Sequence, residues 1–359
     1  MTDTTVSAAN RVAQWDDKAH LAYVRGQRFK PYMGMDENAV IQVKEDLTKK
    51  PGDAITLPLV GALDASAGPN DGTTALVGNE KALPNDGYKI TVGYVRDALT
   101  ATVIEEKKSP IDIREAGRVA LQDLQMRYLR NSIITALGSP TGTTSYAAAS
   151  AAQKNAWNAA NTDRVLFGTL KSNYNATHAT ALANVTAAMK LSKAVVSLMK
   201  RIAQTAVTAN GDGIRPYKYD GDNESYLMFV GTNAFRDLKT DIGTEWKDAQ
   251  ERGKSNPLFV GTTSIYWDGV VIREIPEIAA AGAVGATSAV VAPVYLCGAQ
   301  ALACVWGQRT KTTVRKEDDY GLRFGIGFSE MRGVEKIRYG SAGADWAMVT
   351  GFVGAAADA

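Results

Sequence analysis

The chain is poor in the residues on which most catalytic and metal sites depend, because its 359 residues include only two cysteines and two histidines. Cys297 and Cys304 are too few for a disulfide framework and lie in an apolar stretch, so we expect two buried thiols. His20 and His178 each lie in a polar neighbourhood, away from any potential nucleophile or ligand cluster. We therefore expect ordinary surface histidines, and neither a catalytic triad nor a histidine metal site.

The chain also lacks an excess of charge and any long hydrophobic run. Lysine and arginine number 40 against 38 acids, which gives a formal charge of +2 and no strong field toward nucleic acid or membrane. No apolar run approaches the roughly 18 residues that span a bilayer, and residues 1–10 lack the order of a signal peptide. The hydrophobic share of 45% is typical of a globular protein, and the length of 359 residues suggests two or three domains. We expect no membrane contact.

Two motifs that bind phosphate or calcium in other proteins are incomplete here. Residues 253–255 (Gly-Lys-Ser) resemble the end of a phosphate loop, but Asp248 stands where that loop requires glycine, which favours an exposed helix terminus. Asp220, Asp222 and Glu224 resemble the start of a calcium loop, but the central glycine and the closing glutamate are missing. A polar turn is the favoured interpretation, so the sequence predicts no catalytic, cofactor or metal site.

Two further charged clusters have a structural interpretation beside a functional one. Glu317, Asp318 and Asp319 precede Tyr320 and Gly321 at a predicted strand turn. A solvated turn or an intersubunit ion pair is favoured there over acid and base catalysis. A second, basic group could contact DNA phosphates without sequence specificity, although its spacing favours a solvated helix face; it comprises Lys107, Lys108, Arg114 and Arg118.

The first hundred residues offer little apolar surface for a core of their own. Residues 1–52 mix charges and aromatics, with one short amphipathic helix predicted over 39–47, and are typical of an arm that packs on something else. Residues 53–103 predict an extended hairpin with strands at 54–60 and 89–95, because Pro-Asn-Asp-Gly occurs at both 69–72 and 84–87. We expect intersubunit contacts from both segments and from the acidic turn, made by Arg28, Phe29, Tyr32, Asn70, Asp71, Glu80, Asn85, Asp86, Asp318 and Asp319.

One long helix is the clearest element of the sequence. Ser109 as N-cap, Pro110 at the first helical position and Asp112 predict its start, and Gly138 with Pro140 predicts its end. A helix over 110–137 would span roughly 40 Å at 1.5 Å per residue.

The remainder predicts a mixed α+β fold. Residues 139–163 favour a loose connection or a weak helix, and the other helices are expected at 181–206, 232–240 and 298–306, with a helical turn around Trp246. Strands are expected at 226–230, 264–267, 270–274, 290–296, 310–316, 322–328, 334–339 and 346–353.

Seven short segments, in this order, resemble a known family. They are 28–34 (RFKPYMG), 50–55 (KPGDAI), 76–80 (LVGNE), 256–261 (NPLFVG), 298–301 (GAQA), 319–327 (DYGLRFGIG) and 333–337 (GVEKI). The sequence resembles the major capsid proteins of tailed phages, in particular those of N4-like podophages. Such a resemblance implies the Hong Kong 97-type capsid fold, in which an arm and an extended loop reach over neighbouring subunits.

The resemblance implies a division into an N-terminal arm (1–52), an extended loop (53–103), a peripheral domain with a spine helix (104–190 and 308–359, helix 110–137) and an axial domain (191–307). It also implies hexamers and pentamers of an icosahedral head around double-stranded DNA, assembled in the host cytoplasm with scaffolding, decoration and portal proteins as possible partners. Two alternatives stay open: an encapsulin-like compartment shell, and an enzyme with a carboxylate site at Asp220–Glu224.

Overall fold

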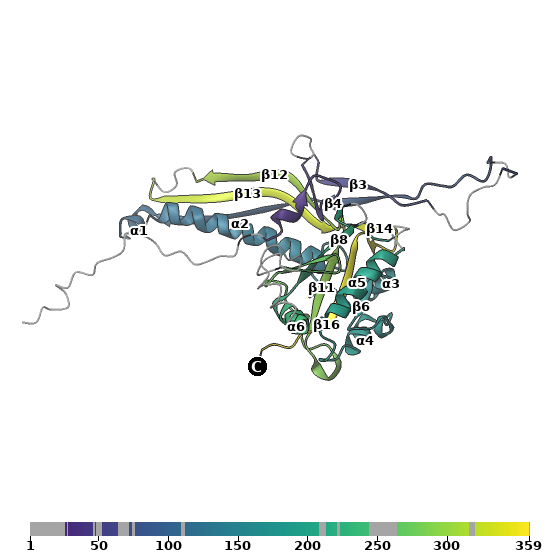
Figure 1. The fold of residues 1–359 in the computed structure, drawn as a ribbon. Coiled ribbons are helices and arrows are strands. Elements are labelled where there is room, and N and C mark those ends of the chain that lie inside the picture. Colours follow the sequence, from purple (N-terminus) through teal and green to yellow (C-terminus); the bar gives the residue numbers. More distant parts are fainter. Residues whose placement is uncertain are drawn as a thin grey trace, which may run out of the picture. The chain divides into compact units, whose positions relative to one another are not determined.

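The structure is a computed structural model that describes residues 26, 28–45, 47, 52–63, 72–73, 76–108, 112–207, 213–220, 223–243, 264–315 and 320–358 (Figure 1). The chain forms two compact units. Of the described residues, 26, 94–129 and 308–331 belong to the first unit, and 28–93, 130–307 and 332–358 belong to the second. The helix at 113–138 and the two longest strands therefore contribute residues to both units.

The second unit is built on a sheet with the strand order β6-β16-β11-β8-β10-β9, to which β7 adds by pairing with β8. Its strands are β6 (Val165–Phe167), β7 (Lys218–Asp220), β8 (Asn223–Val230), β9 (Ser264–Trp267), β10 (Val270–Glu274), β11 (Val291–Cys297) and β16 (Met348–Gly354). Every residue of β11 and of β16 is buried. Such continuous apolar strands are typical of a sheet covered on both faces.

Helix α5 (Lys193–Thr205) shows why the sheet is covered so closely. The Ser192 side chain caps it by accepting a hydrogen bond from the Val195 backbone N–H, and the Met199 side chain lies on its buried face. A Cβ added to Gly351 of β16 would lie 3.1 Å from the Met199 sulfur, so glycine lets helix and strand approach. The other helices of this unit are α3 (Ala151–Ala160), α4 (His178–Ala183) and α6 (Thr232–Ile242), besides short 3-10 turns at Lys30–Tyr32, Lys171–Asn173 and Ala286–Ser288.

A second, five-stranded sheet has the order β1-β2-β12-β13-β5. Its strands are β1 (Met33–Gly34), β2 (Ile41–Lys44), β5 (Gly93–Thr102), β12 (Leu302–Val314) and β13 (Arg323–Lys336). β2 runs parallel to β12, with Ile41 opposite Leu302. β3 (Ala54–Val60) and β4 (Asn85–Thr91) form a separate antiparallel hairpin, and β14 (Arg338–Tyr339) pairs with β15 (Ala344–Asp345).

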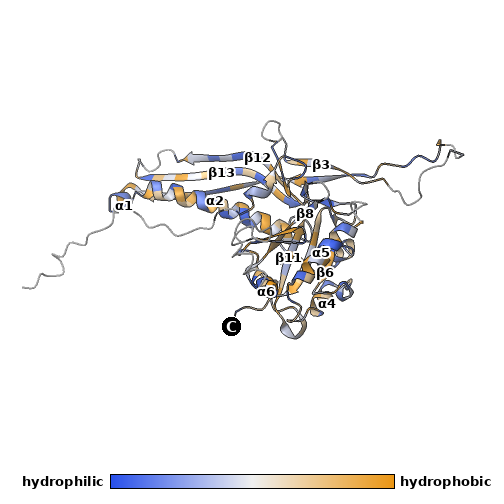
Figure 2. Cartoon of the chain, viewed as in Figure 1, coloured by the Kyte–Doolittle hydropathy of each residue, from blue (hydrophilic) through white to orange (hydrophobic). Residues whose placement is uncertain are grey.

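In the first unit, β5 and the distal parts of β12 and β13 pack against the long helix α2 (Ile113–Gly138), which follows the short helix α1 (Val103–Lys108). Residues 94–102 alternate between exposed and half-buried positions, as a strand with one covered face requires. Figure 2 shows hydrophilic and hydrophobic residues interspersed along α2, β12 and β13. The N-cap predicted at Ser109 and Pro110 lies outside the described residues.

Several predicted elements are confirmed, among them the strands at 264–267 and 270–274 and the strand at 54–60. Others are wrong. The helix predicted over 39–47 is strand β2, and the helix predicted over 298–306 is a turn followed by the start of β12. The single helix predicted over 181–206 is divided between α4 and α5, and the 139–163 segment contains the well-formed helix α3. The helical turn predicted around Trp246 lies outside the described residues.

Candidate functional site

The arm residues that the sequence singles out lie against β8 of the same chain. The Phe29 ring is fully buried and meets the Phe229 ring edge to face at 5.0 Å, and the Tyr32 ring meets Phe229 at 5.7 Å. One guanidinium nitrogen of Arg28 donates a hydrogen bond to the Glu274 carbonyl oxygen over 3.3 Å. Phe29 therefore anchors this segment, and burial raises the pKa of the half-buried Tyr32.

The hairpin residues are arranged differently, because most of their surface is exposed. The Glu80 carboxylate accepts a hydrogen bond of 2.7 Å from the Gly78 N–H and so closes a local turn. The Asp86 carboxylate accepts hydrogen bonds from the N–H groups of Gly87 and Gly340, both 2.7 Å long. The Asn85 amide donates to the Leu83 carbonyl. Asp86 thus fixes the base of the hairpin to its own chain, while Glu80 remains at its exposed surface.

The same hairpin exposes large apolar side chains. Leu76 is 66% exposed and Val77 is 87% exposed, and Val60, Leu63 and Leu83 are each more than half exposed. Contiguous exposed apolar surface is typical of a protein interface. The remaining predicted contact residues, Asn70, Asp71, Asp318 and Asp319, lie outside the described residues.

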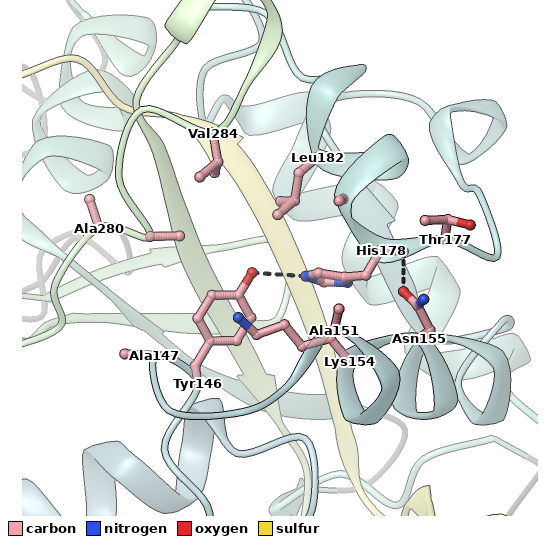
Figure 3. Close-up of a pocket in the computed structure, with 12 residues that line it drawn as sticks. Tyr146, Ala147, Ala151, Lys154, Asn155, Thr177, His178, Leu182, Ala280 and Val284 are labelled. Atoms are coloured by element: carbon pink, nitrogen blue, oxygen red, sulfur yellow. Dashed lines mark hydrogen bonds between the residues drawn. The ribbon is translucent and has the colours of Figure 1, made fainter.

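A half-open cavity of about 710 Å³ lies in the second unit, between α3, α4 and the loop before β11 (Figure 3). The Tyr146 hydroxyl and His178 Nε2 are hydrogen-bonded at 2.8 Å in its wall, and the Lys154 ammonium lies 4.4 Å from the centre of the Tyr146 ring. Alanines, Leu182 and Val284 form most of the remaining surface.

His178 corrects a prediction from the sequence, because it is a core residue and not a surface histidine. It is 2% exposed, and the rings of Trp157, Phe167 and Phe352 surround it at 5.2 to 5.8 Å. Burial, aided by the positive charge of Lys154, lowers the pKa of His178 to about 4. A neutral imidazole in an aromatic cluster, with no carboxylate among the described lining residues, favours a packing role over acid and base catalysis.

A buried ion pair that the sequence did not predict lies beside this cluster. The Lys336 ammonium and the Asp345 carboxylate are 2.8 Å apart, and each side chain is 1% exposed. The Trp157 indole N–H donates a hydrogen bond of 3.1 Å to the same carboxylate oxygen. Burial lowers the pKa of Lys336, although Asp345 opposes this shift. Charges buried in this way are retained only when they are paired, so the pair is a structural element of the core.

The other predicted clusters show no assembled site. The Glu224 carboxylate accepts a hydrogen bond of 2.8 Å from Gln204, while Asp222 and the Asp220 side chain lie outside the described part of the chain. Lys108 pairs with Glu105, and Arg118 pairs with Glu115, both three residues apart in exposed helices. Lys107 is exposed. His20, residues 253–255 and the side chain of Arg114 are outside the described residues.

Wider searches of the described residues agree with this result. They contain no group of three or more histidine, cysteine, aspartate or glutamate side chains able to hold a metal ion. Within the same residues, no helix is long and apolar enough to cross a membrane. Both cysteines are free and buried, as predicted. The described residues offer exposed surface instead: the apolar side chains of the β3–β4 hairpin, and the strands of the first unit that pack against α2.

Comparisons with known proteins place this fold among phage capsid proteins. The model of a family described as phage capsid protein matches residues 3–353, so this chain belongs to the phage capsid protein family. A comparison with curated proteins gives no match. The structure is similar to the capsid of cyanophage Pam1, with a TM-score of 0.87, 35% identity and 100% of each chain covered.

More distant structures share the fold. The capsid of Ralstonia phage GP4 has a TM-score of 0.77 at 19% identity over 100% of both chains, and the head of Helicobacter pylori bacteriophage KHP40 has a TM-score of 0.70 at 12% identity over 96% of both chains. The predicted Hong Kong 97-like fold and the predicted phage capsid function are thereby confirmed. The N4-like subfamily stays a prediction.

Proposed function

We propose that this chain is the major capsid protein that forms hexamers and pentamers of an icosahedral phage head around double-stranded DNA. The observation that carries the proposal is the family match over residues 3–353, together with 35% identity to a cyanophage capsid over the whole of both chains. A capsid role needs surface and no reaction, which agrees with a cavity whose described lining has no acid and base pair. We accordingly propose a structural protein without enzymatic activity.

The domain division and the contact residues expected from the sequence form part of the proposal. Residues 1–52 act as the arm, 53–103 as the extended loop, 104–190 with 308–359 as the peripheral domain and 191–307 as the axial domain. Arg28, Tyr32 and Glu80 keep exposed or half-buried surface that a neighbouring subunit can contact. Modest contacts of this kind suffice in a closed shell, since each is repeated around every capsomer.

Electron microscopy of the purified chain, with and without a scaffolding protein, tests this proposal. We expect rings, sheets or closed shells, and nuclease-protected double-stranded DNA in particles recovered from infected cells. A chain that stays monomeric in all assembly conditions would contradict the proposal. Shells that hold an enzyme cargo and no DNA would instead support an encapsulin-like compartment. Scaffolding, decoration and portal partners would be identified by mass spectrometry of the same particles.

A further inference from the structure

The cavity between α3, α4 and the loop before β11 has walls that are fixed to one another. The His178 backbone N–H donates a hydrogen bond of 2.8 Å to the side-chain oxygen of Asn155, which joins α4 to α3. The loop is held on the other side, since the Ala286 N–H donates one of 2.8 Å to the Val185 carbonyl. Walls fixed in this way form the cavity before any ligand binds, so little order is lost on binding.

The interior of this cavity is apolar and unfilled. Five alanines, Leu182 and Val284 lie in its lining. The Phe352 ring lies 5.9 Å from the Tyr146 ring and 5.2 Å from the His178 ring, measured between ring centres. Because alanine side chains are short, the space between the helices and the loop stays open, with a volume of about 710 Å³. Small-molecule sites have mostly apolar walls and volumes of roughly 300–1,000 Å³, so the cavity has the size and lining of such a site.

One positive charge lies at this apolar surface. Lys154 is the single charged residue of the described lining, and its side chain lies across the Tyr146 ring, with the ammonium 4.4 Å from the ring centre (Figure 3). No carboxylate in the described part of the chain forms an ion pair with this half-buried ammonium. Apolar surroundings strengthen the attraction between opposite charges, so the position favours an anionic group on a ligand.

The Tyr146 hydroxyl supplies a second donor. It is hydrogen-bonded to His178 Nε2 at 2.8 Å, and His178 Nδ1 is buried without a partner among the described residues. Orphaned buried N–H groups are rarer in proteins than orphaned acceptors, so the proton of the neutral imidazole belongs on Nε2 and is donated to Tyr146. The Tyr146 O–H is then free to donate to a ligand, beside the Lys154 ammonium.

We propose that this cavity binds a small molecule with an apolar body and one carboxylate. The carboxylate contacts the Lys154 ammonium and the Tyr146 hydroxyl, and the body fills the alanine-lined space. The lining residues all belong to the second unit of one chain, so binding requires no assembly. The inference goes beyond the proposed shell function and does not rest on it.

The donor set favours a carboxylate over the other anionic groups and over a peptide. A phosphate would bring two charges and several oxygens to one ammonium and one hydroxyl, which would leave acceptors unpaired. An extended peptide would bring backbone N–H and C=O groups against alanine walls that offer them no partner. A single carboxylate with an apolar body leaves neither kind of group unpaired.

Binding of octanoate and of 1-octanol to the unassembled chain tests the charge. We expect calorimetry at neutral pH to show one octanoate site per chain. Lys154→Met should weaken octanoate binding about tenfold or more, because it removes a charge-assisted hydrogen bond and keeps the aliphatic stem. It should change 1-octanol binding by less than about twofold, since the apolar contacts remain. Lys171→Met is the matched control, because Lys171 is exposed and lies outside the described lining.

Tyr146→Phe tests the second donor, because it keeps the ring and removes the hydroxyl. Octanoate binding should weaken about fivefold through the loss of one hydrogen bond. Unchanged binding would overturn the assignment of the Tyr146 O–H to the ligand.

Filling the cavity tests the position. Ala151→Phe and, separately, Ala280→Phe each place a ring at an exposed position of the lining, from which it can enter the cavity without overpacking the core. Both variants should lose octanoate and 1-octanol binding together, by about tenfold or more. Ala152→Phe is the matched control, because Ala152 is exposed, follows Ala151 in α3 and lies outside the described lining. Circular dichroism shows whether each variant is folded.

Four outcomes would overturn the inference, and none of them bears on the shell function. The first is a parent chain that does not bind octanoate, and the second is equal octanoate binding by the parent and Lys154→Met. The third is undiminished binding by both Ala151→Phe and Ala280→Phe, which would place octanoate elsewhere on the exposed apolar surface. The fourth is octanoate binding that disappears in assembled particles, which would assign the cavity to a segment of a neighbouring chain.

Discussion

The two sheets of this protein are stabilised in different ways. In the second unit, β11 and β16 are buried along their whole length, and aromatic and ionic groups fill the space beside them. In the first unit, β5 has no buried residue, and the distal half of β12 is exposed. The second unit therefore has a core of its own, whereas these strands of the first unit keep exposed residues among the described part of the chain.

The largest expected effect concerns the buried ion pair of the second unit. Lys336→Met leaves the Asp345 charge buried without its partner, which should cost about 3–5 kcal/mol of unfolding free energy. Urea unfolding of the unassembled chain measures this. The double variant Lys336→Met, Asp345→Asn should recover most of the loss. For the first unit, Glu115→Gln should give no measurable change, because its pair with Arg118 is exposed. Equal effects of Lys336→Met and Glu115→Gln on the unfolding free energy would contradict the contrast between the two units.

A matched pair of phenylalanines sharpens the same contrast. Phe352 is 2% exposed and stacks on Phe167 with ring centres 5.3 Å apart, so Phe352→Ala should cost about 3–5 kcal/mol. Phe324 in β13 is only half-buried, and Phe324→Ala should cost about 1 kcal/mol in the unassembled chain. The ranking would be refuted by a larger unfolding penalty for Phe324→Ala than for Phe352→Ala.

The pH dependence of the second unit should follow His178. Its folded pKa of about 4 lies below its unfolded value of 6.5, so the unfolded chain takes up a proton first as the pH falls. The stabilisation by neutral His178 is complete above pH 6.5 and is lost between pH 6.5 and about 4, by roughly 3 kcal/mol. The difference in unfolding free energy between the parent and His178→Gln should shrink over this interval. If this difference in unfolding free energy stays constant from pH 7 to pH 4, protonation of His178 does not cause the pH dependence.

An effect smaller than those at Lys336, Phe352 and His178 is predicted at the start of α3. The Ser150 hydroxyl accepts a hydrogen bond from the Gln153 N–H, and the Gln153 side chain accepts one from the Ser150 N–H. Ser150→Ala should therefore cost about 1 kcal/mol, whereas Ser150→Asp should retain most of the stability. Thermal unfolding of the two variants compares them directly, and equal melting temperatures would show that the cap contributes nothing.

The sequence predicts those elements whose signals are local. The strands at 264–267 and 270–274 are confirmed because Asp268 and Gly269 specify the turn between them, and both residues have positive φ angles of 47° and 74°. The helix predicted over 298–306 is wrong at the start of β12, because small residues such as Ala301 and Ala303 fit either structure. Its pairing with β2, about 260 residues earlier in the chain, decides the outcome.

The wrong or missing predictions for site residues have the same cause, because the decisive contacts come from residues that are distant in the sequence. Neighbouring residues do not show that His178 is buried, because the rings around it come from α3, β6 and β16. Lys336 and Asp345 are likewise ordinary charged residues until β14 and β15 bring them together. The cations Arg309, Lys311 and Arg315 differ in this respect, because their alternation along the sequence by itself predicts one side of a strand.

The place of β16 in the second unit has a consequence for synthesis. This strand lies between β6 and β11 and pairs with both, so the sheet cannot close before residue 354 has left the ribosome. A compact unit generally folds as a whole. A nascent or truncated chain that lacks β16 leaves two strand edges unpaired. The strand order therefore requires the second unit up to residue 354 before its sheet is complete.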